Sequence, residues 1–229
     1  MEQQEALQAV RVNGVTLHYF TAGEGRPVVL VHGNGEDHRL FGTQIRQLTE
    51  AGWKVYAPDS RGHGANAPLP EYHYADMAED MYRFIRALGL RQPAFYGHSD
   101  GGIIGLLLEI LHPGTVGLMA VSGTNLSPEG LRPDFIAECQ AMHAASPNPL
   151  IALMLYEPHI TEAQLETIAA PVLVTAGEHD LVLPEESRRL AEHLPRGELV
   201  IIPGADHGSY IEGSEVMGRL LLEFFARHS

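Results

Sequence analysis

The chain of 229 residues is 45% hydrophobic and 19% charged, which excludes a disordered protein and supplies enough apolar surface for one large domain. Its formal net charge of −14 at pH 7 argues against nucleic acid and membrane surfaces as partners, because both repel an acidic protein. The single cysteine, Cys139, excludes an intrachain disulfide; with an acidic N-terminus and no apolar run of membrane-spanning length, it predicts a cytoplasmic location.

Strands and helices are predicted to alternate along the chain after an N-terminal hairpin, whose turn is Asn13-Gly14. Strands are predicted at residues 9–12, 15–20, 28–31, 53–57, 93–96, 116–121, 172–176 and 199–202. Helices are predicted at residues 74–88, 102–112, 185–194 and 215–227. Continuous apolar strands between helices predict an α/β fold with a mostly parallel sheet of about eight strands, covered by helices on both faces.

Residues 125–168 interrupt this alternation, because they contain no predicted strand and exceed the length of an ordinary connection. Helical patches are predicted within them at residues 133–142 and 150–155. We interpret the segment as a lid inserted at the strand ends, within a single domain that spans residues 1–229.

Residues 97–101 match the Gly-x-Ser-x-Gly pattern of a nucleophile elbow, with Ser99 at its centre. An apolar strand precedes the pattern and an apolar helix follows it, which is the context that this motif needs. Side chains two residues before and after the serine would collide across so tight a turn, and Gly97 and Gly101 avoid that collision.

A serine nucleophile needs a base, and the base needs an acid to orient it. Asp180 ends the loop after strand 172–176, and His207 ends the loop after strand 199–202. Ligands of such sheets bind beyond the carboxyl ends of the strands, so Ser99, Asp180 and His207 can converge there. Glu178 is the alternative acid, whereas His207 is the one histidine of 13 in the loop that directly follows the last strand.

Taken together, the motifs resemble those of the α/β-hydrolase superfamily, as a serine hydrolase with a short lid. The matching segments are residues 32–35, 59–64, 97–101, 177–184 and 203–207. The resemblance implies that Ser99 is the nucleophile, His207 the general base and Asp180 the orienting acid. It also implies an oxyanion hole formed by the backbone N–H groups of Asn34 and Asp100, and no cofactor.

Asp100 departs from the resemblance, because many relatives carry Met, Gln or Leu after the nucleophile. Its carboxylate either opposes charge in the oxyanion region or interacts with the N-terminal dipole of the following helix. Asp100 could also be taken for a dehalogenase-type nucleophile, but that register would put His98 where a small residue is needed.

The acyl pocket is expected to draw on apolar residues of the lid and of one body loop, although these could equally be ordinary packing residues. The candidates are Phe41, Met142, Leu150, Met154, Leu155 and Tyr156. Cys139 is expected to be a packing residue of the lid, since no histidine pairs with it.

Several other polar residues are expected to be structural. These are His32, Asp59, Arg61, His63 and His98. No metal is predicted, because the run Glu36-Asp37-His38 lacks a second cluster at metal-ligand spacing. No phosphate loop is predicted either, because residues 33–35 lack a following Gly-Lys-Ser/Thr.

The sequence thus predicts a serine hydrolase that cleaves a small carboxylic ester or lactone through an acyl-enzyme. The alternatives are the same triad acting on a thioester, an amide or a carbon–carbon bond, perhydrolysis, cyanohydrin lyase activity, or a ligand-binding protein that kept the fold. The expected partner is a small acyl substrate, and nothing in the sequence indicates an oligomeric state.

Overall fold

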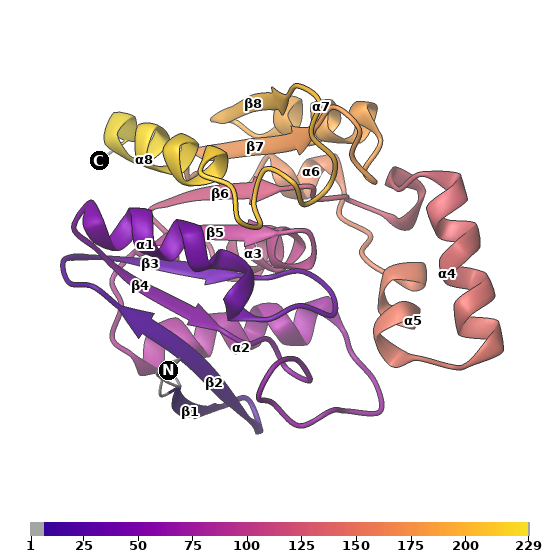
Figure 1. The fold of residues 1–229 in the computed structure, drawn as a ribbon, viewed down its shortest axis with the longest axis horizontal. Helices are drawn as coiled ribbons and strands as arrows, with labels where there is room; N and C mark the ends of the chain where they lie inside the picture. Colours follow the sequence, from indigo (N-terminus) through magenta and orange to yellow (C-terminus); the bar gives the residue numbers. More distant parts are fainter. Residues whose placement is uncertain (1–6, 229) are drawn as a thin grey trace.

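The computed structural model describes residues 7–228 and contains one eight-stranded sheet (Figure 1). The strands are Gln8–Val12 (β1), Val15–Ala22 (β2), Arg26–Val31 (β3), Trp53–Pro58 (β4), Ala94–His98 (β5), Leu118–Ser122 (β6), Val172–Gly177 (β7) and Gly197–Ile202 (β8). Their order is β1-β2-β4-β3-β5-β6-β7-β8, and β3 to β8 run parallel. The predicted mostly parallel sheet is confirmed.

The N-terminal hairpin forms the antiparallel edge of this sheet. β2 runs antiparallel to both β1 and β4, with Val12 paired to Val15 across the turn. Asn13 and Gly14 both have positive φ angles, 44° and 81°, which is the backbone twist of the preferred two-residue hairpin turn. The predicted hairpin is therefore present.

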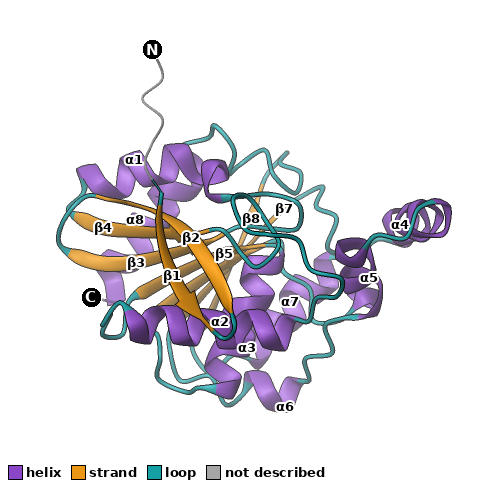
Figure 2. Ribbon diagram, turned by 90° about the horizontal axis from the view of Figure 1, so that it is seen from below, coloured by secondary structure: helices purple, strands orange, loops and turns teal. Residues whose placement is uncertain are grey.

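Helices cover both faces of the sheet. They are Gly42–Glu50 (α1), Tyr74–Ala87 (α2), Asp100–Leu111 (α3), Pro133–Ala145 (α4), Pro149–Tyr156 (α5), Glu162–Leu165 (α6), Pro184–His193 (α7) and Val216–His228 (α8), with short 3-10 helices at His38–Phe41 (η1) and Pro128–Gly130 (η2). α1 and α8 lie on one face, and α2, α3 and α7 lie on the other (Figure 2). No helix within residues 7–228 is both long and apolar enough to cross a membrane.

The two faces bury separate apolar clusters, which explains why the central strands are apolar without alternation. Leu48 of α1 and Phe225 of α8 pack with Val55 on one side. Phe84 of α2 and Ile103 of α3 pack with strand residues on the other. The clusters hold the parallel strands so that their carboxyl ends meet at one edge.

The sequence pattern predicts no helix at α1. Its buried face includes a polar residue, Gln44, whose side-chain amide donates hydrogen bonds to the carbonyls of Ile211 (2.9 Å) and Ser214 (3.0 Å). These partners lie far away in the sequence, so the apolar periodicity that identified the other helices is broken here.

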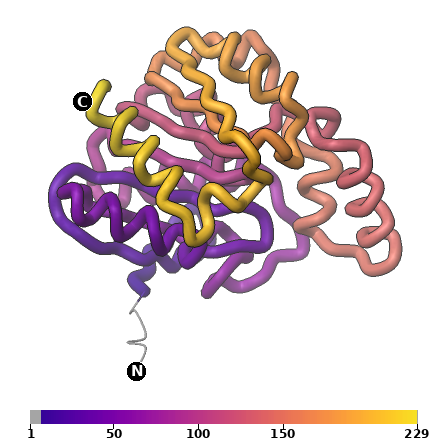
Figure 3. The backbone as a smooth tube through the Cα atoms, turned by 45° about the horizontal axis from the view of Figure 1, so that its top comes forward, coloured from indigo at the N-terminus to yellow at the C-terminus, as the bar shows by residue number. Residues whose placement is uncertain are grey.

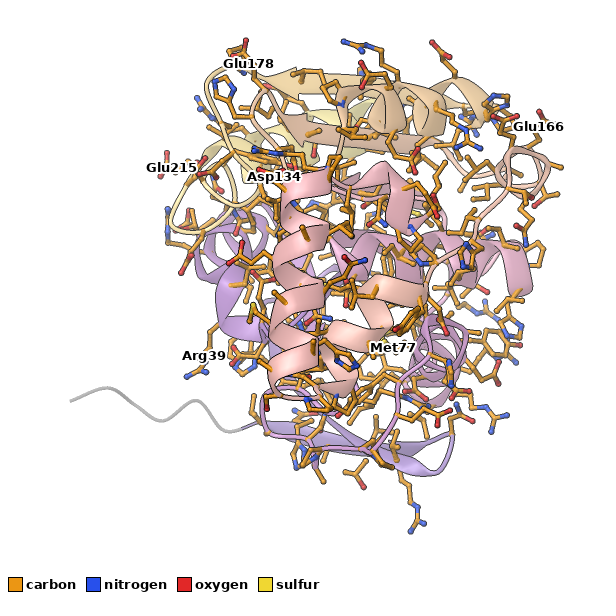
Figure 4. All side chains as sticks on the ribbon, turned by 90° about the vertical axis from the view of Figure 1, so that its right-hand side faces the viewer. Arg39, Met77, Asp134, Glu166, Glu178 and Glu215 are labelled. Carbon is orange, nitrogen blue, oxygen red and sulfur yellow. The ribbon has the colours of Figure 1, made fainter. Side chains whose placement is uncertain are left out.

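The inserted segment between β6 and β7 holds η2, α4, α5 and α6. α4 and α5 coincide with the predicted helical patches and stand beyond the carboxyl ends of the strands (Figures 1 and 3). α4 buries only Cys139 among its residues. In a view from that side, α4 lies in front, with Asp134 near its first turn (Figure 4). This position suits the predicted lid.

Candidate active site

Ser99 sits between β5 and α3 in a backbone conformation that L-residues rarely adopt. Its φ is 52° and its ψ is −115°, and its N–H donates to the carbonyl of Ser122 at 2.7 Å. A Cβ atom on Gly97 would lie 2.1 Å from the Gly101 carbonyl oxygen, and one on Gly101 would lie 1.9 Å from the Val31 carbonyl oxygen. The two glycines are therefore sterically required for the sharp turn at Ser99.

Asp180 and His207 meet through a short hydrogen bond of 2.6 Å between Oδ1 and Nδ1. Asp180 is buried and also accepts the backbone N–H groups of Gly177 (3.0 Å) and Val182 (3.1 Å). Burial alone would raise the pKa of Asp180, but its hydrogen bonds and the neighbouring imidazole outweigh burial and lower that pKa. An ionised carboxylate only accepts, so Nδ1 of His207 donates and the lone pair lies on Nε2, as a general base requires.

Glu178, the alternative acid, lies elsewhere. Its side chain is exposed and accepts the Gly204 N–H at 2.7 Å, and Figure 4 shows it at the outer edge of the molecule. The structure thus brings Asp180, and not Glu178, to His207.

Two further residues pack against the His207 ring. Gly123, after β6, has a φ of 56°, and a Cβ there would lie 2.7 Å from both Cε1 and Nδ1 of His207. The ring of His98 lies 4.8 Å from that of His207, centroid to centroid. Burial lowers the pKa of His98 to about 3, so this neighbour is neutral. Gly123 could not be identified from the sequence, because one glycine after a strand carries no distinctive signal.

The loop after β3 passes directly beside Ser99. A Cβ on Gly33 would lie 3.0 Å from the Ser99 Cβ, and the Gly33 N–H donates to Glu36 at 2.8 Å. Among the hydrogen bonds of residues 7–228, none uses the backbone N–H of Asn34 or of Asp100 as a donor. Both N–H groups remain free to bind a ligand.

Asp100, the first residue of α3, is buried, and both of its carboxylate oxygens accept hydrogen bonds. Oδ1 accepts the Tyr74 hydroxyl at 2.7 Å, and Oδ2 accepts Nδ2 of Asn34 at 3.0 Å. Burial raises the pKa of Asp100, while these two hydrogen bonds favour its ionised form. The partners are 26 and 66 residues away in the sequence, so the sequence did not reveal them.

Ser99 and His207 line one cavity of about 190 Å³. The other lining residues are Gly33, Asn34, Glu36, Tyr74, His98, Asp100, Asn125, Leu131, Phe135, Met154, Glu157 and Leu181. Three of these are carboxylates, and none of the described lining residues is Lys or Arg. Burial raises the pKa of two of the three, Glu36 and Asp100.

Of the six candidate pocket residues, Met154 lines this cavity. Phe41 lies instead in the core, with its ring 5.4 Å from that of Tyr96, centroid to centroid. The side chains of Met142 (52% exposed) and Tyr156 (66% exposed) face solvent. The remaining two, Leu150 and Leu155, are half-buried outside the cavity lining.

The rotation of a lid helix about its own axis decides which residues face the cavity, and the apolar content of α5 does not encode that rotation. Phe135 and Leu131 reach the cavity from the start of the inserted segment, where the sequence analysis named no candidate. Glu157 reaches it from the end of α5. These three positions carry no motif.

The polar residues expected to be structural make buried internal contacts. His32 accepts the Ser60 N–H on Nε2 at 2.9 Å, and burial lowers its pKa to about 4. The guanidinium of Arg61 donates twice to Asp80, at 2.7 and 2.6 Å. These bonds tie the loops around the site to the body of the protein.

Asp37, His38 and Asp59 bring their side-chain donor atoms within 4.8 Å of one another, close enough to hold a metal ion. Asp59 is already engaged, since it accepts both the backbone N–H (3.0 Å) and Nδ1 (2.7 Å) of His38. It also accepts the Ala65 N–H at 2.9 Å. His38 and Asp59 are thus joined by internal hydrogen bonds, whereas Asp37 accepts hydrogen bonds from Arg39.

Comparison with known proteins gives a consistent family. The model of the alpha/beta hydrolase fold family matches residues 26–142, and the TAP-like protein model matches residues 155–228. Bifunctional epoxide hydrolase 2 of Sus scrofa is 33% identical over 158 residues, which are 67% of this chain and 27% of that protein. This chain thus corresponds to a minor part of that relative's length.

Serine hydrolase BPHL of Mus musculus is 26% identical over 246 residues, covering 94% of this chain and 84% of that protein. Among solved structures, a malate-bound thermophilic esterase from Thermogutta terrifontis superimposes with a TM-score of 0.82 at 22% identity, over 97% of this chain and 100% of that one. The sheet, the elbow and these matches lead to one assignment. The chain belongs to the α/β-hydrolase fold family, whose members among its relatives are hydrolases.

Proposed function

We propose that this protein is a serine hydrolase that cleaves a small carboxylic ester or lactone through an acyl-enzyme. The observation that carries the proposal is that His207 bonds Asp180 at 2.6 Å and lines the same cavity as the strained Ser99. Ser99 attacks the carbonyl carbon while Nε2 of His207 takes its proton. His207 then protonates the leaving alcohol and activates the water that cleaves the acyl-enzyme.

The oxyanion of each tetrahedral intermediate accepts hydrogen bonds from the backbone N–H groups of Asn34 and Asp100. Asp100 is also the first residue of α3, so the positive end of the helix dipole faces the developing charge. The cavity of about 190 Å³ suits a small acyl group, and its carboxylates favour one without negative charge.

Ser99 is favoured over Asp100 as the nucleophile. The positive φ of the elbow belongs to Ser99, whereas the Asp100 carboxylate is engaged by Tyr74 and Asn34. The same fold and triad can cleave several kinds of bond, so thioesters, amides and carbon–carbon substrates belong in the same assay panel. A cytoplasmic location and a small acyl substrate complete the proposal.

Replacement of the nucleophile tests the proposal directly. Ser99→Ala should lower kcat on a short-chain chromogenic ester by about 10³-fold or more, because the nucleophilic route is lost. A fluorophosphonate probe should label the wild-type protein at Ser99, as mapped by mass spectrometry, and should leave the variant unlabelled. Ser127→Ala, a serine outside the cavity lining, is the matched control. Wild-type turnover by Ser99→Ala would refute the proposal.

A further inference from the structure

We infer that Asp100 is a positioning residue that couples the seating of the lid helix α5 to the placement of the oxyanion loop. The inference rests on the proposed function, since it assumes that the Asn34 N–H binds the oxyanion. It concerns the carboxylate side chain of Asp100, whose N–H has a separate role.

Asp100 lies at the centre of a hydrogen-bond network that reaches both ends of α5. Nδ2 of Asn34 donates to Oδ2 of Asp100 at 3.0 Å and to the carbonyl of Leu150, in the first turn of α5, at 3.1 Å. Both N–H groups of this amide are thereby used, one on the elbow and one on the lid.

The second arm of the network runs through Tyr74, which is 1% exposed. Its hydroxyl donates to Oδ1 of Asp100 at 2.7 Å, and its backbone N–H donates to Glu157, the residue after α5, at 3.0 Å. The start and the end of α5 are therefore each bonded to a residue that also bonds Asp100.

The network explains why a carboxylate is tolerated beside an oxyanion site. An ionised Asp100 has only acceptors, so it draws the Asn34 amide and the Tyr74 hydroxyl towards the elbow. Holding the Asn34 side chain restrains the backbone of the same residue, which lines the cavity. The seated lid adds the Leu150 carbonyl as a second restraint on that amide.

Loss of the Asp100 side chain should free the loop and the lid together. Asp100→Ala should lower kcat at least tenfold with a smaller change in KM, because the oxyanion donor is misplaced mainly in the transition state. Hydrogen exchange of a peptide spanning residues 147–160, followed by mass spectrometry, should become faster in the same variant. Asn34→Ala should show both effects.

The conservative variant separates hydrogen bonding from charge. In Asp100→Asn the carbonyl can accept from Asn34, and the amide can donate to the Tyr74 hydroxyl oxygen. The kcat of Asp100→Asn should therefore be at least tenfold higher than that of Asp100→Ala, and hydrogen exchange of the lid peptide should be slow again. The double variant of Asp100→Ala and Asn34→Ala should be no more than about threefold slower than the slower single variant.

The matched control is Glu109→Gln, on the same helix. Glu109 is also buried and accepts two backbone N–H groups, from Gly114 at 3.0 Å and Val116 at 2.7 Å, outside the cavity lining. This variant should leave kcat and lid exchange unchanged even if its melting temperature falls.

Three results would overturn the inference. They are a kcat of Asp100→Ala within threefold of wild type, unchanged lid exchange in Asp100→Ala and Asn34→Ala, or an Asp100→Asn variant as impaired as Asp100→Ala. If Asp100→Ala does not fold, Asp100→Asn and Asn34→Ala carry the test. Activity surviving Ser99→Ala would instead refute the proposed function, and the exchange measurements, which need no turnover, would still report on the network.

Discussion

At the scale of single residues, the position of the His207 ring depends on the absence of a side chain at Gly123. A Cβ there would lie 2.7 Å from the ring, which is closer than real Cβ contacts, so the ring would have to move. Nδ1 of the same ring also bonds Oδ1 of Asp180 at 2.6 Å. Gly123 and Asp180 thus both fix the position of the imidazole.

Gly123→Ala should therefore lower kcat by about 10²-fold, because a displacement of about 1 Å is enough to misalign the proposed general base, His207. Steady-state kinetics on a short-chain ester provides the measurement. A kcat within threefold of wild type would show that the ring does not depend on this contact.

Gly114→Ala is the control for backbone strain. Gly114 also has a positive φ, of 79°, but a Cβ there would meet nothing within 4 Å. Both substitutions should destabilise the fold by about 1 kcal/mol through strain, and only the one at residue 123 should affect kcat.

At the scale of elements, the inserted segment is joined to the loop before α2 by an ionic contact. His73 lies between Glu157, at 2.6 Å, and Glu71, also at 2.6 Å. The hydrogen bonds to Glu157 and Glu71 raise the pKa of His73 to about 9. The contact is partly exposed, since the His73 side chain is 46% accessible, so salt should weaken it.

This pKa gives the contact a defined pH window. Folded and unfolded His73 are both charged below about pH 6.5, so the stabilisation is complete there and is lost as the pH rises through about 9. The melting temperature of wild type should exceed that of His73→Gln by about 1–2 °C at pH 6, and the difference should vanish by pH 10. Scanning calorimetry measures it, and a difference independent of pH would contradict this assignment.

The local sequence pattern predicted those elements whose buried residues are apolar and follow one another without a polar interruption. Val28 to Val31 and the elbow at Ser99 could be identified, because chain order and spacing suffice for a parallel strand and a tight turn. α1 was missed because Gln44 occupies its buried face through partners about 170 residues later. The Asn34–Asp100–Tyr74 network was missed for the same reason, since each bond joins separate loops or helices.

At the scale of the whole molecule, the protein has a net charge of −14, and its cavity is also acidic. Three carboxylates line the cavity, those of Glu36, Asp100 and Glu157. Among the described lining residues, only histidine side chains can carry a positive charge. Both the surface and the site should therefore repel an anionic substrate, during approach and after binding.

A charged and a neutral ester of similar length should reveal this repulsion. Monomethyl succinate should have a kcat/KM at least tenfold below that of methyl pentanoate, since charges about 10 Å apart at an effective dielectric of about 20 repel by about 1.7 kcal/mol. Raising the salt concentration, or the substitution Glu36→Gln, should bring the kcat/KM values of the two esters closer together. Equal kcat/KM values for the two esters would mean that the cavity carboxylates are neutral or do not face the substrate.

The inserted segment leaves the body of the protein beside the loop that carries Asp180. The Arg132 N–H donates to the Leu181 carbonyl at 2.9 Å, and the Leu183 N–H donates to the Gly130 carbonyl at 2.8 Å. These bonds fasten the base of the segment next to Asp180, while α4 beyond it contributes little to the core. The outer helices can therefore differ in length or sequence without disturbing the hydrogen bond between Asp180 and His207.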